Sequence, residues 1–314
     1  KERRVVAETI YSTVRNMELP KWIYDKLAEQ MAKAEIELLV SSLMVQAPLT
    51  LRVNTLKTNR QKIIKELAHF NPIECKFSPY GLQLNDRTFL SKHPVFTEGL
   101  IEVQDESSQL AGLLLNPKRS EMVVDFCAGA GGKTLLLGML MRNSGRIYAF
   151  DINQKRLGNL NPRLARSGLS NVFPQLIQNE NDTKVKRLHG KIDRVFVDAP
   201  CSGLGTLRRS PELKFRQSET GIAELNIKQL SILNSASKLL KVGGMLVYAT
   251  CSILKEENED IVNTFLFNNT NFKVIPVSTV LDNPDLANDT GFLCLMPHMH
   301  NTDGFFAALM QRIN

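Results

Sequence analysis

Two hydrophobic patterns alternate along the chain from residue 122 onward. Short apolar runs, typical of buried strands, occupy residues 122–126, 146–151, 193–198 and 245–249. Apolar residues at helical spacing fill the segments 133–142, 154–167, 222–240 and 256–267. This alternation predicts βαβ units and an α/β fold with a mainly parallel sheet. Near the end, runs at 292–295 and 305–309 flank a turn-rich segment and predict a hairpin that closes one sheet edge.

The first hundred residues have a different pattern of apolar positions. Residues 1–46 carry apolar side chains at helical spacing and predict a helical segment, in which we expect Trp22 to pack in a core or an interface. Residues 47–103 combine strand-like alternation at 49–53, an amphipathic helix at 62–70 and several turn signals, which predicts a small α+β domain. We therefore expect three parts, 1–46, 47–103 and 104–314.

Composition narrows the class of protein. Of the residues, 43% are hydrophobic and 23% charged, as in soluble globular proteins, and no apolar stretch approaches the roughly 20 residues of a membrane span. The net charge of +7 suits a polyanionic partner. The five cysteines form no Cys-x-x-Cys pair, so we expect no metal site and a reducing, cytoplasmic location. Because the chain begins with Lys1, we expect it to be part of a longer protein.

A glycine-rich loop follows the run at 122–126. Its sequence from Asp125 to Thr134 is DFCAGAGGKT. A P-loop is disfavoured because that motif requires glycine where this chain has Cys127, and the dinucleotide fingerprint would need glycine at Thr134. The remaining option is S-adenosylmethionine, a nucleoside cofactor without pyrophosphate. We expect Asp151, at the end of the next strand, to accept hydrogen bonds from its ribose, and Asp125 to lie near its amino-acid end.

Two cysteines lie where predicted strands end. Cys201 follows Asp198-Ala199-Pro200, and Cys251 follows Thr250. The carboxyl ends of strands in an open α/β sheet form the ligand-binding edge. The sequence therefore predicts that the two thiols lie at neighbouring strand ends, at one site with covalent chemistry.

These motifs together resemble the signature motifs of RNA cytosine-5 methyltransferases of the RsmB (Sun, or Nol1/Nop2/Sun) family. The resemblance runs from about Ala47 to the C terminus and includes the glycine loop, Asp198-Ala199-Pro200-Cys201-Ser202-Gly203 and Thr250-Cys251-Ser252. It implies that residues 104–314 are a catalytic domain, a class I S-adenosylmethionine-dependent methyltransferase with a Rossmann-like sheet, and that residues 47–103 are a small RNA-binding domain. It also implies that the Cys251 thiolate attacks carbon 6 of cytosine, which makes carbon 5 nucleophilic, and that Cys201 assists product release.

The resemblance extends to further site residues. Asp198 is expected to hydrogen-bond cytosine and Lys133 to face the base or the nucleophile. An acid after the third strand contacts adenine in this family; here Glu180 or Asp182 could serve, and we favour Glu180. The residues expected at the cofactor are Cys127, Ala128, Gly129, Ala130, Gly131, Gly132, Lys133, Asp151, Glu180 and Asp198. Ala130 stands where many relatives have proline, and we expect no loss of function from it.

RNA is the expected partner, and on the resemblance alone it is ribosomal RNA. Basic residues beside the catalytic edge can neutralise phosphates, and a flipped or single-stranded base can then reach the thiols. The residues expected to contact RNA are Arg52, Asn54, Arg208, Arg209 and Lys214, with Phe215 and Arg216 nearby. A transfer RNA methyltransferase and a non-catalytic RNA-binding or ribosome-assembly factor are the alternatives. We expect a monomer that binds neither membrane nor metal.

Overall fold

The larger of two sheets has the strand order β10-β12-β9-β8-β5-β6-β7 in the computed structural model, which describes residues 2–84, 90–286 and 289–314. Strands β5 to β9 pair in parallel, whereas β12 is antiparallel to β9 and β10. The predicted mainly parallel sheet is confirmed. The strands are β5 (Met122–Phe126), β6 (Arg146–Asp151), β7 (Val172–Leu176), β8 (Ile192–Asp198), β9 (Leu240–Thr250), β10 (Phe272–Ile275), β11 (Leu293–Leu295) and β12 (Phe305–Arg312).

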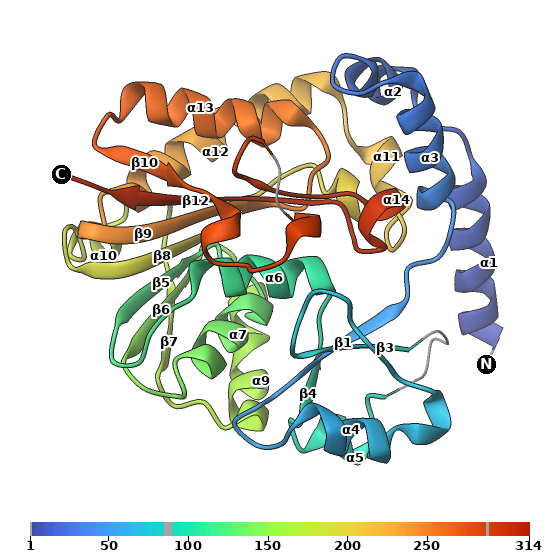
Figure 1. Ribbon diagram of the computed structural model, residues 1–314, viewed down its shortest axis with the longest axis horizontal. Helices are drawn as coiled ribbons and strands as arrows, with labels where there is room; N and C mark the ends of the chain where they lie inside the picture. The colour runs from blue at the N-terminus through green and yellow to red at the C-terminus, as the bar shows by residue number, and fades with distance from the viewer. Residues whose placement is uncertain (1, 85–89, 287–288) are drawn as a thin grey trace.

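Strand alternation divides the core into two layers. Val123 packs into one cluster with α6, α7 and α9, and its neighbour Val124 packs into another with α12 and α13, because successive side chains point to opposite faces. Figure 1 shows these two groups of helices on opposite sides of the sheet. The covering helices are α6 (Glu106–Leu115), α7 (Gly132–Leu140), α8 (Gln154–Gly158), α9 (Leu160–Ser167), α10 (Thr183–Lys186), α12 (Glu219–Ser237) and α13 (Glu259–Asn268).

The C-terminal hairpin differs from the prediction. β11 and β12 do pair antiparallel, but β12 lies inside the sheet and β10 forms its edge. The buried run from Phe305 to Met310 explains this position, because side chains on both faces of β12 are covered. β7 and β10 were not among the strands read from the apolar runs, since both carry exposed or half-buried residues.

A smaller antiparallel sheet, β2-β3-β1-β4, precedes the large one. Leu51, Val53, Leu82 and Ile101 bury its inner face against Ile63 of α4. The elements are β1 (Leu49–Val53), α4 (Arg60–Glu66), η1 (Ala68–Phe70), β2 (Ile73–Glu74), β3 (Gly81–Leu84), α5 (Pro94–Thr97) and β4 (Ile101–Val103). The three-part domain division stays a prediction.

Three helices come first: α1 (Glu2–Asn16), α2 (Lys21–Ala28) and α3 (Lys33–Leu43). Helices α2 and α3 share a cluster with Leu204, Ile253 and Leu254, which follow the two cysteines. Trp22 packs against this cluster, which confirms its predicted role. Helices α2 and α3 therefore support the segments that carry the thiols.

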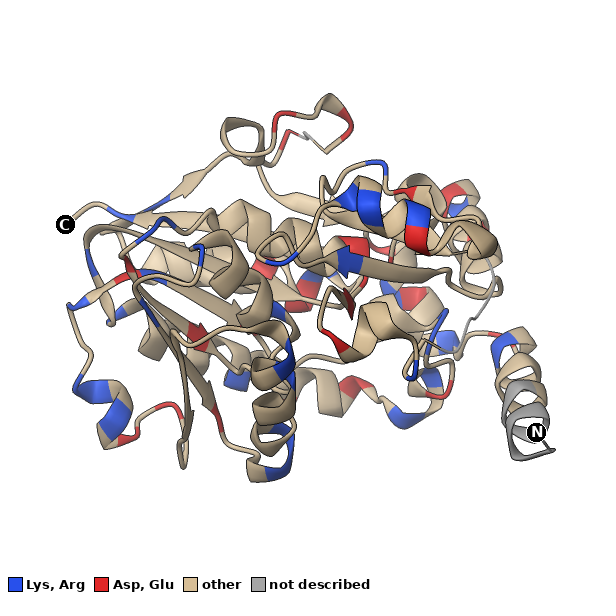
Figure 2. Ribbon diagram, turned by 90° about the horizontal axis from the view of Figure 1, so that it is seen from below, with Lys and Arg blue, Asp and Glu red and all other residues tan. Residues whose placement is uncertain are grey.

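The remaining short elements lie mostly beyond the strand ends. They are η2 (Leu204–Thr206), α11 (Leu213–Arg216), η3 (Lys255–Glu257), η4 (Val277–Thr279), η5 (Pro284–Leu286) and α14 (Pro297–His300). Figure 2 shows Lys and Arg spread over many elements among Asp and Glu, so the net charge of +7 is not confined to one segment. Within the described ranges, no helix combines the length and apolarity needed to span a bilayer.

Candidate active site

The glycine loop connects β5 to α7 and faces open space. Gly129 N donates to Asp151 Oδ2 at 2.7 Å, which ties the loop to the end of β6. Apart from Gly129 itself and its two chain neighbours, no heavy atom lies within 4 Å of the place where a Cβ on Gly129 would stand. The loop backbone is thus free to approach a ligand closely. Asp125 is fully buried beneath the loop, where its Oδ2 accepts from Thr134 Oγ1 at 2.5 Å; it does not line the space above.

A cavity of about 600 Å³ opens at this loop and along the ends of β6, β7 and β8. Its volume is in the range of small-molecule sites. Of the residues expected at the cofactor, it is lined by Cys127, Gly129, Asp151, Glu180 and Asp198, and both Cys201 and Cys251 also line it. The residues present therefore fit a nucleoside cofactor: a carboxylate at the rim, an exposed loop backbone, and apolar walls from Ile152, Ile177 and Ile232.

A second cavity, of about 410 Å³, is also lined by residues of the glycine loop. Ala128, Ala130, Gly132 and Lys133 line it, while Gly131 lines neither cavity. Gly129 and Asp198 border both cavities, so the two spaces adjoin. The walls of the second cavity also include residues of the small sheet and of the chain after it, among them Thr50, Gln104 and Asp105.

The acid expected at adenine falls in the turn after β7. Glu180 lines the larger cavity, and its Oε1 accepts from Ser231 Oγ at 2.6 Å. Asp182 instead caps α10, accepting from Lys184 N at 2.9 Å and from Gln178 N at 2.8 Å. The geometry favours Glu180 over Asp182, and its contact with adenine stays a prediction.

The two cysteines meet across neighbouring strand ends, as the sequence predicts. β8 and β9 are parallel neighbours, and Cys201 Sγ lies 3.4 Å from Cys251 Sγ. The hydrogen bond with Cys251 and burial raise the pKa of the Cys201 thiol well above its ordinary value. The two thiols therefore form a close pair at the cavity wall, and the role of each in catalysis stays a prediction.

Lys133 and Asp198 form an ion pair beside the thiols, with Lys133 Nζ 2.8 Å from Asp198 Oδ2. Burial alone would lower the pKa of Lys133, but Asp198 outweighs it and the pKa is raised. The ammonium group lies 5.4 Å above the centroid of the Phe305 ring, in cation–π range. Lys133 thus remains a cation, held by Asp198 and Phe305. Sequence reasoning missed Phe305, because its position depends on β12 entering the sheet next to β9.

The five residues expected to contact RNA have partners within the protein. Arg52 donates to Gln104 Oε1 and, at 2.9 Å, to Gly132 O, which joins the small sheet to the glycine loop. Asn54 donates to Gly99 O and Ser167 O. These side chains are 3% and 6% exposed, so in this structure they connect parts of the protein. RNA contact by them stays a prediction.

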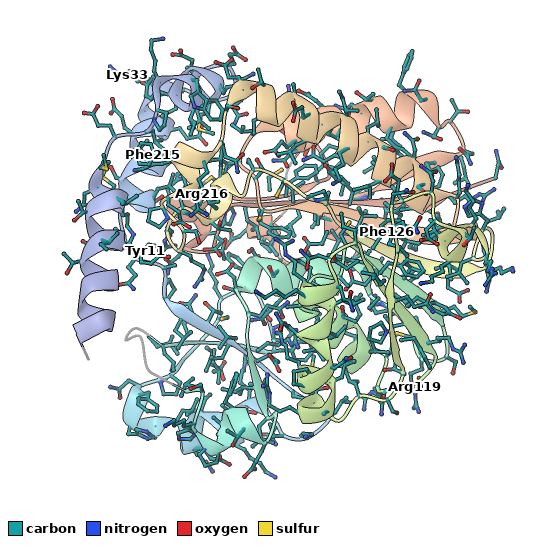
Figure 3. The ribbon with its side chains drawn as sticks, turned by 180° about the vertical axis from the view of Figure 1, so that it is seen from behind. Tyr11, Lys33, Arg119, Phe126, Phe215 and Arg216 are labelled. Atoms are coloured by element: carbon teal, nitrogen blue, oxygen red, sulfur yellow. The ribbon has the colours of Figure 1, made fainter. Side chains whose placement is uncertain are left out.

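The other three residues expected to contact RNA, which are Arg208, Arg209 and Lys214, follow Cys201 in the chain. Arg208 is buried and donates to Asn301 Oδ1 and Thr302 O, while Lys214 donates to Arg15 O and Met17 O. Figure 3 shows the next two side chains, Phe215 and Arg216, on α11 beside the N-terminal helices, and both are exposed.

Arg209 has two carboxylate partners. Its guanidinium lies 2.7 Å from Asp105 Oδ2 and 2.7 Å from Asp303 Oδ2. This network links the Cys201 segment to the start of α6 and to the segment before β12. The role of Asp303 was also missed, because the sequence indicated only a turn there.

A family model and curated proteins similar to this chain are described as ribosomal RNA methyltransferases. A family model described as "16S rRNA methyltransferase RsmB/F" matches residues 112–311, and one for the ferredoxin-like domain of RsmF/B-like methyltransferases matches residues 19–89. A "Probable ribosomal RNA small subunit methyltransferase B" of Synechocystis sp. is 35% identical over 93% of this chain and 66% of its own. The human "28S rRNA (cytosine(4447)-C(5))-methyltransferase" is 33% identical over 93% of this chain and 38% of its own.

Solved structures share the fold. A methyltransferase homologue from Pyrococcus horikoshii superposes with a TM-score of 0.76 and 29% identity, covering 94% of this chain and 100% of its own. NSun6 from the same organism has a TM-score of 0.83 at 23% identity over 94% of this chain and 98% of its own. The predicted Rossmann-like methyltransferase fold with a small α+β domain is confirmed. This chain, which spans about two thirds of the Synechocystis relative, belongs to the RsmB/F family of ribosomal RNA methyltransferases.

Proposed function

We propose that the protein methylates carbon 5 of a cytidine in ribosomal RNA, using S-adenosylmethionine, the methyl donor of its family. The observation that carries the proposal is the approach of Cys201 and Cys251 to 3.4 Å at the wall of the cavity next to the glycine loop. A single buried cysteine is most often a packing residue. Two thiols beside an ion pair at the carboxyl edge of the sheet are an arrangement for covalent catalysis.

Carbon 5 of cytosine is a poor nucleophile. One thiol activates it, and the other assists release of the methylated base. The Cys251 thiolate adds to carbon 6, so that the electrons of the 5,6 double bond become available at carbon 5. When bound, S-adenosylmethionine would supply an electrophilic methyl group, with S-adenosylhomocysteine as the leaving group. After methylation the proton on carbon 5 must be removed, and the bond between carbon 6 and Cys251 breaks as the double bond returns. Cys201, 3.4 Å from Cys251, is positioned to assist this release.

Asp198 and Lys133 support the first step. Asp198 borders both cavities, and its carboxylate would accept hydrogen bonds from the exocyclic amine of cytosine and from nitrogen 3 once that nitrogen is protonated, the state in which carbon 6 is more electrophilic. Lys133 keeps a positive charge near Cys251, in the part of the site where the attack on carbon 6 would take place. The ion pair between them keeps both groups oriented before the base arrives.

The two adjoining cavities would bind the two reactants, the cofactor and the target nucleotide, separately. Asp151 and the glycine loop would hold the cofactor in the larger one. The smaller one, lined by Lys133, Arg163 and Arg209, would admit the target nucleotide, whose base must leave its stack to reach the thiols. Asp198 and Gly129 stand at the junction, where the methyl group and the base would meet.

Bisulfite sequencing of ribosomal and transfer RNA from cells with and without the gene tests the proposal. Loss of one 5-methylcytosine from ribosomal RNA, restored by the gene but not by a Cys251→Ala form, is the expected result. Loss from transfer RNA alone would overturn the choice of substrate. No lost 5-methylcytosine in either RNA would overturn the enzymatic proposal and leave an RNA-binding role.

A further inference from the structure

A buried carboxylate joins the two segments that carry the thiols. Glu257 is fully buried in η3, six residues after Cys251. Its Oε2 accepts from Ser202 Oγ and from Ser252 Oγ, both at 2.5 Å. Ser202 directly follows Cys201, and Ser252 directly follows Cys251. One oxygen atom therefore contacts the residue after each thiol.

The other oxygen holds the Cys201 segment by its backbone. Glu257 Oε1 accepts from Ser202 N at 2.8 Å and from Gln229 Nε2 at 3.0 Å. Gln229 Nε2 also donates to Pro200 O at 3.0 Å, on the other side of Cys201. The backbone on both sides of Cys201 is thus fixed by groups that meet at one carboxylate.

The two serines repeat the same local arrangement. Ser202 Oγ accepts from Leu204 N, and Ser252 Oγ accepts from Leu254 N, each two residues further along the chain. The two hydroxyl oxygens lie 3.2 Å apart, and each serine is 1% exposed. Each hydroxyl accepts a hydrogen bond that stabilises the turn in its own segment and donates one to Glu257. The conformation of both segments therefore depends on the Glu257 carboxylate.

The energetics explain why a carboxylate is suited to this position. Burying a charge is costly unless hydrogen bonds compensate, and bonds to a charged acceptor are about twice as strong as neutral ones. Four donors satisfy Glu257, and its own carbonyl accepts from Tyr248 OH at 2.7 Å. Removing the carboxylate would leave these buried donors unpaired, so the two segments would separate or rearrange.

We propose that Glu257 is a positioning residue that sets the distance between the Cys201 and Cys251 thiols by holding Ser202 and Ser252 on one carboxylate. It touches neither thiol in the structure and acts through the serines. The inference deepens the function proposed above and rests on it for the role of the thiols in methyl transfer. The spacing itself does not depend on that function.

The test measures thiol spacing and turnover separately in Glu257→Ala, Glu257→Gln and the wild type. Dibromobimane, which fluoresces when a thiolate has displaced bromide at each of its two bromomethyl carbons, reports thiols close enough to bridge. Cys201→Ala provides the background from the other cysteines. Because this assay contains neither RNA nor cofactor, it reports on Glu257 even if the protein does not methylate RNA.

We expect Glu257→Ala to lose most of the bridged product and to lower kcat by about 100-fold, since a misplacement near 1 Å has that effect, with KM for RNA little changed. Glu257→Gln should retain most of the bridged product and most of kcat, because its amide can accept from Ser202 N and donate to the two hydroxyls. Glu256→Gln, which contacts Lys26 instead, is the matched control and should behave as wild type.

Wild-type bridging and kcat in a folded Glu257→Ala protein would overturn the proposal, as would an equal loss in Glu256→Gln. If Glu257→Ala does not fold, the Ser202→Ala, Ser252→Ala double variant removes both hydroxyls and leaves the acid in place. Reduced bridging in that variant supports the proposal, and unchanged bridging overturns it.

Discussion

Cys201 and Cys251 lie 50 residues apart in the chain, yet their sulfur atoms are 3.4 Å apart. Parallel pairing of β8 with β9 brings the two segments together. The distance is short enough for one thiol to act on a group bonded to the other. We propose that Cys251 attacks the base and that Cys201 assists release of the product, so substitutions of the two cysteines should have different effects.

Cys251→Ala should abolish methyl transfer, because the nucleophile is lost. Cys201→Ala should instead accumulate a covalent protein–RNA adduct, because release is impaired while attack remains. Denaturing gel electrophoresis of enzyme mixed with labelled RNA and cofactor measures the adduct. Cys75→Ala, a substitution at a buried thiol of the small domain, is the control that forms no lasting adduct. An adduct that persists in Cys251→Ala rather than Cys201→Ala would show that the roles are reversed.

Lys133→Met and Asp198→Asn should each lower the single-turnover rate by about 10²–10⁴-fold, the usual contribution of a positioned polar group. The double variant should lose little more than either single one, since the two side chains form one ion pair. Lys155→Met, at an exposed position of α8, should leave the rate unchanged. Multiplicative losses in the double variant would mean that the two groups act independently.

Arg209→Ala should destabilise the protein by about 3–5 kcal/mol, because two partly buried carboxylates lose their shared cation. Urea unfolding measures the change in the free energy of unfolding. Arg216→Ala, an exposed arginine on α11, provides the comparison and should differ from wild type by less than about 0.5 kcal/mol. Similar unfolding curves for both variants would contradict a structural role for Arg209.

Gly205→Ala should disturb the contact between the Cys251 segment and the start of β12. Gly205 N donates to Cys251 O, Gly304 N donates to Gly205 O, and a Cβ on Gly205 would lie 2.0 Å from Gly304 O. We expect a loss of about 1–3 kcal/mol or more in unfolding free energy, together with lower turnover. Gly158→Ala in α8 has free space and should be neutral or slightly stabilising. Equal stability of the two variants would argue against the close packing.

Asp125→Asn should remove part of the pH dependence of stability. Burial raises the pKa of Asp125 to about 7, against about 3.9 in an unfolded chain. The folded protein therefore holds this proton more tightly, and the stability it contributes is lost as pH rises from about 4 to 7. Relative to Asp125→Asn, the wild type should lose about 2 kcal/mol of unfolding free energy between pH 5.5 and pH 8. A difference that does not change with pH would contradict a raised pKa.

The sequence by itself determined the parts of the structure that depend on local patterns. Apolar runs correctly located β5, β6, β8 and β9, because a buried strand needs side chains suited to both faces. Motif spacing disfavoured the P-loop and dinucleotide alternatives, and the place of Cys201 and Cys251 after two of these strands predicted their meeting. β7 and β10 were harder to find, since their exposed positions interrupt the apolar pattern.

Only the tertiary structure decided the partners of the charged and polar side chains. A basic residue after Cys201 has the same sequence signature whether it binds RNA or, like Arg209, pairs with Asp105 and Asp303. Insertion of β12 beside β9 brought Phe305 to Lys133, and the turn into η3 brought Glu257 to Ser202. Hydrophobic periodicity is set by neighbours in the chain, whereas these contacts join residues far apart in sequence. They exist only once the strands and helices have packed together.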